Sequence, residues 1–242
     1  MKRTCLLALA AMTIAFPTAS LAAPGKITNC PKTITQAGLY ELQDNLDAIG
    51  TCITIQADFV TINLNGFRIR GNGTGSAIID QAPAYRGTSV RNGTVTNFEN
   101  AISIGTGATV DEVKSFDNIN VGILVTQGIV RNSQAEGNLN NHGISVAGRS
   151  LVTGNISRNN RTGISGSHGS HIRGNTVTDN SVGGIVTVGT GLVIADNAVF
   201  NNTSFGIYVS CPSLVLGNTA LMHSSNLMLD GTGCRDEHNL TQ

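Results

Sequence analysis

A short motif, a small residue followed by an aliphatic one, recurs along the chain at an almost constant interval. The clear occurrences are Ala101-Ile102, Gly122-Ile123, Gly143-Ile144, Gly163-Ile164, Gly184-Ile185 and Gly206-Ile207, with Asn226-Leu227 as an altered seventh. Successive motifs are separated by 21, 21, 20, 21, 22 and 20 residues. Cys52-Ile53 and Ala77-Ile78 extend the series upstream with longer spacings, which gives about nine units. A fixed period in this range indicates a repeat architecture.

Each motif begins a short run in which apolar residues lie two apart, as in Gly143-Ile144-Ser145-Val146. This alternation is typical of a half-buried β-strand. A unit of this length with three short strands has no room for a crossover helix, so each strand must pair with its equivalent in the next unit. The sequence therefore predicts an all-β fold, a parallel β-solenoid. A leucine-rich repeat of similar period would need several Leu per unit, which this chain lacks.

Asparagine recurs at two further positions of the repeat. The first lies about ten residues before each motif, and the second lies five residues after the first. The first column is Asn92, Asn132, Asn155, Asn175, Asn197 and Asn218, with Val113 in one unit. The second is Asn97, Asn118, Asn160, Asn180 and Asn202, with Gly137 and His223 as departures. Asn tolerates left-handed backbone and bonds to nearby backbone groups. We therefore predict tight corners whose asparagines stack from coil to coil.

Units such as Ile172-Arg173-Gly174-Asn175-Thr176-Val177 followed by Gly184-Ile185-Val186 resemble the repeats of the pectin-lyase-like superfamily. The segments Thr33-Ile34-Thr35-Gln36 and Val60 to Gly66 resemble the first turns of its exported members. The resemblance covers nearly the whole mature chain and implies a right-handed parallel β-helix with an internal Asn ladder. It also implies that the Gly-Ile strands form the first sheet, over which enzymes of this superfamily usually bind polysaccharide. Fold alone does not fix an activity.

The N-terminal segment has the features of a secretory signal peptide. Lys2 and Arg3 precede an apolar run from Leu6 to Phe16, and small residues follow up to a cleavage site after Ala22. We expect a signal peptide at 1–22, an N-terminal cap and first coil at 23–56, the β-helix at 57–235 and a tail at 236–242. No later segment approaches the ~20 apolar residues of a membrane-spanning helix. The mature protein is thus expected to be secreted or periplasmic and to be a monomer.

Four cysteines remain after residue 22, and four cysteines allow three pairings. The spacings from Cys30 to Cys52 and from Cys211 to Cys234 are each about one repeat unit. Pairs of this kind would link the first two and the last two coils, where a solenoid otherwise frays. We therefore predict the disulfides Cys30–Cys52 and Cys211–Cys234, which agree with an oxidising compartment.

The residues after the motif aliphatics should point outward and form a row on the first sheet. This row is Ser103, Leu124, Ser145, Ser165, Val186, Tyr208 and Met228. It contains no carboxylate, whereas inverting glycoside hydrolysis needs two carboxyl groups roughly 6.5–9.5 Å apart. A calcium-dependent uronate lyase needs several carboxylates. The row therefore supports neither chemistry, and we predict no metal site and no cofactor.

Catalysis by basic groups is the remaining enzymatic hypothesis. The segment Asn141-His142-Gly143 resembles the His-Gly segment of polygalacturonases, although the adjacent-turn Asp-Asp of those enzymes is missing. Uronate β-elimination needs only a base and a cation that neutralises the carboxylate. The candidate catalytic residues are His142, Arg149 and Tyr208. His168 and His171 are interpreted as a surface pair, because two His without a third ligand are a weak metal signal.

We favour a protein that presents an elongated face to polysaccharide or a cell-surface partner, with an acidic polysaccharide as the expected ligand. The alternative is a uronate lyase-like enzyme. Candidate substrate-binding residues are Ser103, Ser145, Arg161, Tyr208, Tyr85 and Arg86, of which the last two form an aromatic and basic pair in an insertion. Only 12% of the residues are charged and the formal net charge is zero, which argues against a nucleic-acid partner.

Overall fold

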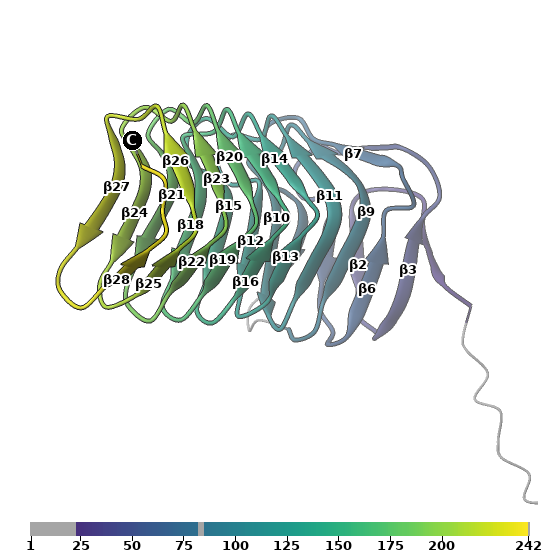
Figure 1. Cartoon of the computed structure of the whole chain (residues 1–242). Helices are drawn as coiled ribbons and strands as arrows, with labels where there is room; N and C mark the ends of the chain where they lie inside the picture. The colour runs from purple at the N-terminus through teal and green to yellow at the C-terminus, as the bar shows by residue number, and fades with distance from the viewer. Residues whose placement is uncertain (1–22, 82–84, 242) are drawn as a thin grey trace, which may run out of the picture.

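The computed structural model describes residues 23–81 and 85–241, so the predicted signal peptide lies outside the described residues. The described residues contain β-strands and no helix, and the strands are wound into one elongated solenoid (Figure 1). A typical coil has three strands, β15 (His142–Ala147), β16 (Leu151–Thr153) and β17 (Ile156–Arg158). The next coil repeats them as β18 (Thr162–Ser167), β19 (His171–Arg173) and β20 (Thr176–Thr178).

The Gly-Ile strands form a parallel sheet of ten strands, here called the motif sheet. Besides β15 and β18 it contains β2 (Lys32–Ile34), β5 (Ile53–Ile55), β8 (Ser76–Asp80), β10 (Asn100–Thr106), β12 (Ile123–Thr126), β21 (Gly183–Val188), β24 (Phe205–Ser210) and β27 (Ser225–Asp230). The sheet confirms the parallel β-solenoid. It has about ten coils rather than the nine counted from the motifs, because β2 carries Lys-Thr-Ile and lacks the small residue that defines the motif.

The other two sides of each coil join in an 18-stranded sheet. Its strands besides those of the two typical coils are β1 (Gly25–Ile27), β3 (Gly38–Leu42), β4 (Leu46–Asp47), β6 (Val60–Asn63), β7 (Arg68–Arg70), β9 (Ser89–Thr96), β11 (Thr109–Phe116), β13 (Ile129–Arg131), β14 (Gln134–Glu136), β22 (Val193–Ala195), β23 (Ala198–Phe200), β25 (Leu214–Leu216), β26 (Thr219–Leu221) and β28 (Arg235–Glu237). Every pairing between coils is parallel, for example Leu151 beside His171.

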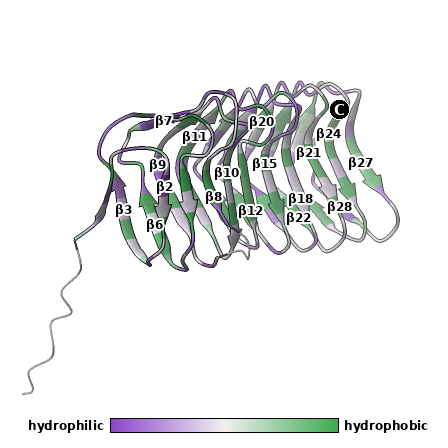
Figure 2. Ribbon diagram, turned by 180° about the vertical axis from the view of Figure 1, so that it is seen from behind, coloured by the Kyte–Doolittle hydropathy of each residue, from purple (hydrophilic) through white to green (hydrophobic). Residues whose placement is uncertain are grey.

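The core is a column of aliphatic side chains along the axis of the coil. The motif aliphatics from Ile53 to Ile207 are at most 1% exposed, and buried Val and Ile of the large sheet face them. Figure 2 shows apolar and polar residues alternating along the strands. The last coil is different, because Leu227 and Leu229 occupy core positions but are only partly buried. No further coil covers them.

Two ladders of asparagine run along the solenoid, one at each of two corners. The first joins Asn155, Asn175, Asn197, Asn218 and Asn239. Each side-chain oxygen accepts bonds from the backbone and side-chain nitrogens of the preceding Asn, as Asn175 does from Asn155 at 3.0 Å. The second ladder joins Asn118, Asn138, Asn160, Asn180 and Asn202 and ends at His223. The stacking predicted from the sequence is therefore confirmed at both corners.

Three predicted ladder members are misplaced by one residue. Asn92, Asn97 and Asn132 adopt left-handed backbone, with φ of 57°, 61° and 50°, at positions just before the ladder. The ladder positions themselves hold Gly93, Phe98 and Ser133, of which Phe98 and Ser133 are buried. The sequence pattern did not distinguish the two positions, because Asn is favoured at both. At the first it is favoured for its left-handed backbone, and at the second, the ladder position, for its side-chain hydrogen bonds. For the same reason Asn138, rather than Gly137, carries the second ladder.

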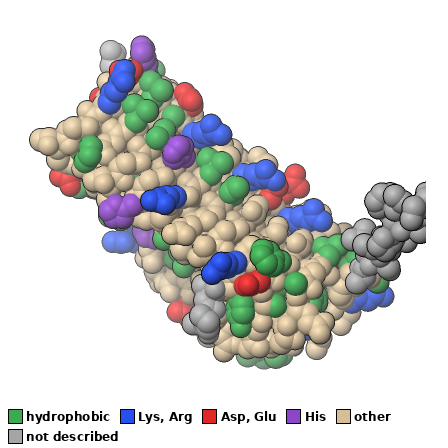
Figure 3. Space-filling view, turned by 90° about the horizontal axis from the view of Figure 1, so that it is seen from below, with side chains coloured by type: hydrophobic (Ala, Val, Ile, Leu, Met, Phe, Trp, Pro, Cys, Tyr) green, Lys and Arg blue, Asp and Glu red, His purple; other side chains and the backbone are tan. Residues whose placement is uncertain are grey.

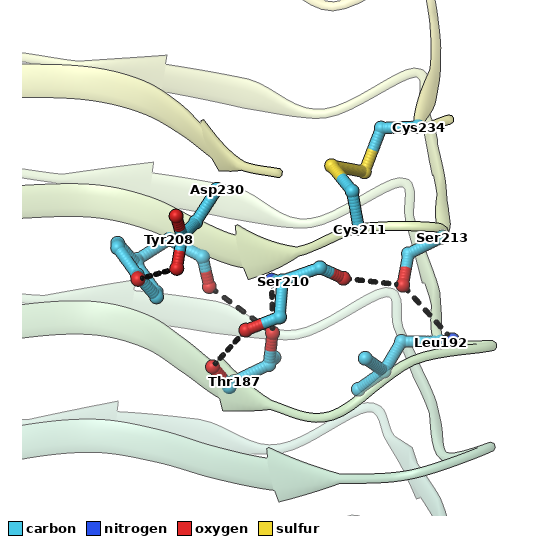
Figure 4. The surroundings of a disulfide bond; sticks show 8 residues. All are labelled: Thr187, Leu192, Tyr208, Ser210, Cys211, Ser213, Asp230 and Cys234. Carbon is cyan, nitrogen blue, oxygen red and sulfur yellow. Dashed lines mark hydrogen bonds between the residues drawn. A yellow bond between two sulfur atoms is a disulfide. The ribbon is translucent and has the colours of Figure 1, made fainter. Parts of the chain in front are cut away.

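The disulfides are those predicted. Cys30 is bonded to Cys52 and Cys211 to Cys234, so each bond joins neighbouring coils at one end of the solenoid. Figure 4 shows the C-terminal bond beside Ser213, which caps the turn after β24. Within the described residues, no helix is long and apolar enough to cross a membrane.

Candidate glycan-binding surfaces

The outward row of the motif sheet is continuous. Its seven predicted members lie side by side on successive strands, from Ser103 beside Leu124 to Tyr208 beside Met228. Thr33, Thr54 and Ile79 extend the row to the first strand. Its side chains are half-buried or exposed and none carries a charge. The surface therefore offers hydroxyl groups and apolar area at intervals of ~4.8 Å.

Near its C-terminal end, the outer face of the motif sheet carries an aromatic pair that includes Tyr208 of the row. The rings of Phe205 and Tyr208 have centroids 5.6 Å apart and planes inclined at 60°. The Tyr208 hydroxyl donates a hydrogen bond to Asp230, the last residue of the neighbouring strand (Figure 4). This bond is the main cause of a raised pKa of Tyr208. A raised pKa leaves a smaller fraction of the hydroxyl ionised at neutral pH, so Tyr208 is better suited to stacking than to proton abstraction.

His142 lies at the start of β15, at the opposite end of the strands from the corner that holds Arg149. Its ring is half-buried, and its Nδ1 atom is buried without a hydrogen-bond partner in the described residues. Burial lowers the pKa of His142, and the positive charge of Arg161 lowers it further. His142 is therefore a neutral imidazole close to a cationic side chain.

The three predicted catalytic residues do not lie at one place. Arg149 is exposed at the corner after β15, seven residues from His142, which at about 3.3 Å per residue separates them by roughly 20 Å. Tyr208 is three strands from β15 in the motif sheet, about 14 Å at the strand spacing. One substrate bond cannot be within reach of all three side chains. Among the predicted functional groups in the described part of the chain, Arg161 is the one whose charge acts on His142.

The remaining predicted binding residues are distributed over the surface. Ser103 and Ser145 belong to the outward row, and Arg161 is exposed at the corner before β18. Arg86 is exposed and Tyr85 is half-buried at the insertion between β8 and β9. The backbone nitrogen of Arg86 donates to Asp58 at 2.8 Å, which holds this part of the insertion against the preceding coil.

Two carboxylates in strands of the motif sheet were not singled out from the sequence. Asp230 is exposed in β27, and Asp80 is half-buried at the end of β8. Burial raises the pKa of Asp80, although a hydrogen bond from the Gly105 nitrogen at 2.6 Å opposes this effect. Seven strand intervals, about 34 Å, separate Asp80 from Asp230. They therefore cannot act as the paired acid and base of a glycosidase, which lie less than ~10 Å apart.

In the described residues, no group of three or more His, Cys, Asp or Glu side chains could hold a metal ion. His168 and His171 lie in one corner, but the Nδ1 atom of His168 accepts a hydrogen bond from the backbone nitrogen of Thr190.

No protein-family model matches the chain, and no curated protein matches it by sequence. Similar solved structures include two mutants of the periplasmic alginate epimerase AlgG. A single mutant aligns over 83% of this chain and 64% of its own, with 15% identity and a TM-score of 0.56. A double mutant aligns over 79% and 63%, with 14% identity and a TM-score of 0.52. The chain thus spans less than two thirds of these structures, and the likeness shows a shared parallel β-helix fold.

Proposed function

We propose that the protein is exported and presents the outer face of the motif sheet to a polysaccharide or another cell-surface partner without cleaving it. The observation that carries this proposal is the uncharged outward row, which stays in register over all ten strands. A polymer chain is a suitable ligand for such a row because both are long and periodic. The polysaccharide-related structural neighbours support this function. The two disulfides support a secreted or periplasmic location.

The outer face of the motif sheet provides two kinds of contact with sugars. Ser103, Ser145 and Ser165 offer hydroxyl groups that donate and accept hydrogen bonds. Phe205 and Tyr208 offer aromatic area, and the exposed Asp230 carboxylate accepts bonds from sugar hydroxyls. Arg161 lies at one edge of the sheet and can hold a carboxylate of an acidic polysaccharide bidentately. The aromatic end therefore suits an uncharged part of the polymer, and the Arg161 edge an acidic part.

Binding is tested with the mature chain, residues 23–242, on columns of immobilised acidic and neutral polysaccharide. Phe205→Ala with Tyr208→Ala is expected to weaken retention at least about tenfold, because two stacking side chains are lost. Asn140→Ala is the matched control, since Asn140 is exposed at a corner away from the row. Unchanged retention of the double variant would move the site elsewhere, for example to Tyr85 and Arg86.

A second candidate function rests on the neighbourhood of His142 and Arg161. A neutral imidazole can accept the proton in a uronate β-elimination, and the nearby guanidinium can neutralise the carboxylate. This activity would produce an unsaturated sugar that absorbs near 235 nm. Absorbance that appears with the wild type and disappears in both His142→Ala and Arg161→Ala would establish the lyase and refute the non-cleaving proposal.

A further inference from the structure

A groove of about 610 Å³ lies beside the motif sheet, around the corner that joins it to the large sheet. It crosses four successive coils, whose positions Thr109, Ile129, Leu151 and His171 are in register. Three intervals at the strand spacing make it about 14 Å long. It is thus a defined depression on the middle coils, separate from the outward row.

Small residues form the floor of this groove. Gly107, Gly128 and Gly169 come from three of the four coils. A Cβ atom on Gly128 would lie 2.2 Å from the backbone oxygen of Ala108, so no larger residue fits without a shift of the backbone. A Cβ atom on Gly169 would lie 3.2 Å from Cγ of Arg149, which places the stem of Arg149 directly over this glycine. The aliphatic part of Arg149 therefore lies beside Gly169 at the groove.

The polar side chains of the groove are cationic or neutral. Arg149, His171 and Arg173 line it and are exposed, and no carboxylate lines it. In the described part of the chain, neither Arg149 nor Arg173 forms an ion pair, whereas four other arginines do. The acid on the adjoining strands, Asp111, is already bound by Arg131 at 2.8 Å. The guanidinium groups of Arg149 and Arg173 thus have unused donors.

The space-filling view from below shows the basic and His side chains along this side of the solenoid, with few acidic ones among them in the middle coils (Figure 3). The next coil differs, because Val193 follows His171 and Ala195 follows Arg173 in the register. On the C-terminal side, the basic side chains of this column therefore end at the coil of His171 and Arg173.

We propose that this groove binds the anionic groups, carboxylate or sulfate, of an acidic oligosaccharide through Arg149 and Arg173. The inference rests on the proposed glycan-binding function for its ligand class and adds a second surface to it. Planar guanidinium groups bind such oxyanions with two parallel hydrogen bonds. A polymer held here by its charges could pass over the corner to the motif sheet, where uncharged contacts predominate.

The test is calorimetric titration of the mature chain with oligogalacturonate and with its methyl ester, which has the same backbone without the charge. Binding of the acid and at least about tenfold weaker binding of the ester are expected. Arg149→Gln with Arg173→Gln should weaken binding of the acid a further tenfold or more. Arg70→Gln with Arg91→Gln, which removes equal charge at exposed positions outside the groove, should leave it nearly unchanged. A sulfated oligosaccharide forms a second arm.

The outcomes separate the groove from the motif sheet. Loss of acid binding in the groove variant, with retention in Phe205→Ala/Tyr208→Ala, would support the groove and count against the sheet. Equal affinity of the wild type and the groove variant for both the carboxylated and the sulfated ligand would overturn this inference and leave the sheet proposal intact. Equal losses in the groove variant and the Arg70/Arg91 variant would also overturn it, because only net charge would then matter. Stronger binding of the sulfated ligand would support the groove and identify sulfate as its preferred anion.

Discussion

The buried asparagines are the residues with the clearest individual role. Asn175 accepts hydrogen bonds from Asn155 and donates to Val152, Arg173 and Asn197, so one side chain connects three coils. Each bond satisfies a backbone or amide group that the corner removes from water. Buried polar groups without partners cost about 1–3 kcal/mol each, so these bonds are needed wherever the backbone turns inside the solenoid.

Asn175→Ala is expected to lower the free energy of unfolding by about 2–3 kcal/mol, because the backbone nitrogen of Asn155 and the oxygen of Val152 lose their partner. Asn140→Ala should change it by less than about 0.5 kcal/mol, since Asn140 is exposed. Urea unfolding followed by circular dichroism measures both. Similar midpoints for the two variants would contradict the structural role of the ladder.

His142 should make stability depend on pH. Its folded-state pKa is lowered by burial and by Arg161, whereas the unfolded chain has the ordinary value near 6.5. The folded state therefore binds the proton less well, and stability present above about pH 6.5 is lost as the pH falls through this value. His142→Asn should lose less stability than the wild type between pH 7.5 and 5.5 in thermal melts. Parallel pH profiles would contradict the lowered pKa.

The strands are short, and each is stable only because it pairs with its equivalents in the neighbouring coils. The end strands have one neighbour instead of two, and there the disulfides lie. The bond between Cys211 and Cys234 closes a segment with a sequence separation of 23 residues that includes β25, β26 and β27. It therefore restrains the last coil, whose core leucines are incompletely covered.

Cys211→Ser with Cys234→Ser should destabilise the last coil, since closing a loop of this length contributes about 3 kcal/mol. Hydrogen exchange should show faster exchange in β26 to β28 and little change in β12 to β18. Cys30→Ser with Cys52→Ser is the matched variant and should affect β1 to β5 instead. Uniform loss of protection along the whole chain in either variant would show that the bonds do not act locally.

At the scale of the whole molecule, a solenoid has two open ends at which further strands could pair. The C-terminal end is protected by charge. Asp236 stands beside the buried Val215, at a position where earlier coils have core aliphatics, and Arg235 and Glu237 flank it. A charge at a core-facing position of an edge strand discourages another chain from pairing with that strand, because the pairing would bury the charge.

We therefore predict that the mature chain is a monomer in sedimentation velocity experiments. Asp236→Val should promote end-to-end association, because it extends the apolar core to the open edge. Glu99→Val, at an exposed corner away from both ends of the solenoid, is the control and should remain monomeric. A wild-type dimer that persists unchanged in Asp236→Val would show that another surface associates.

The period of the motif, the alternation along each strand and the cysteine spacing determined the solenoid and both disulfides, because these features repeat with the coil and are read directly along the chain. The outward row with Ser103, Ser145 and Tyr208 followed from the same alternation. The ladder register at Asn92, Asn97 and Asn132 could not be obtained, since adjacent positions of a corner favour the same residue for different reasons.

The side-chain contacts between coils could be determined only from the tertiary structure. The sequence places Tyr208 and Asp230 far apart, yet one strand pairing brings them into hydrogen-bond contact and changes the role expected of the tyrosine. It also gives no sign that Arg149, His171 and Arg173 share a groove, because the residues that line the groove come from four successive coils. Charges and cavities depend on which coils face one another, and only the folded chain decides that.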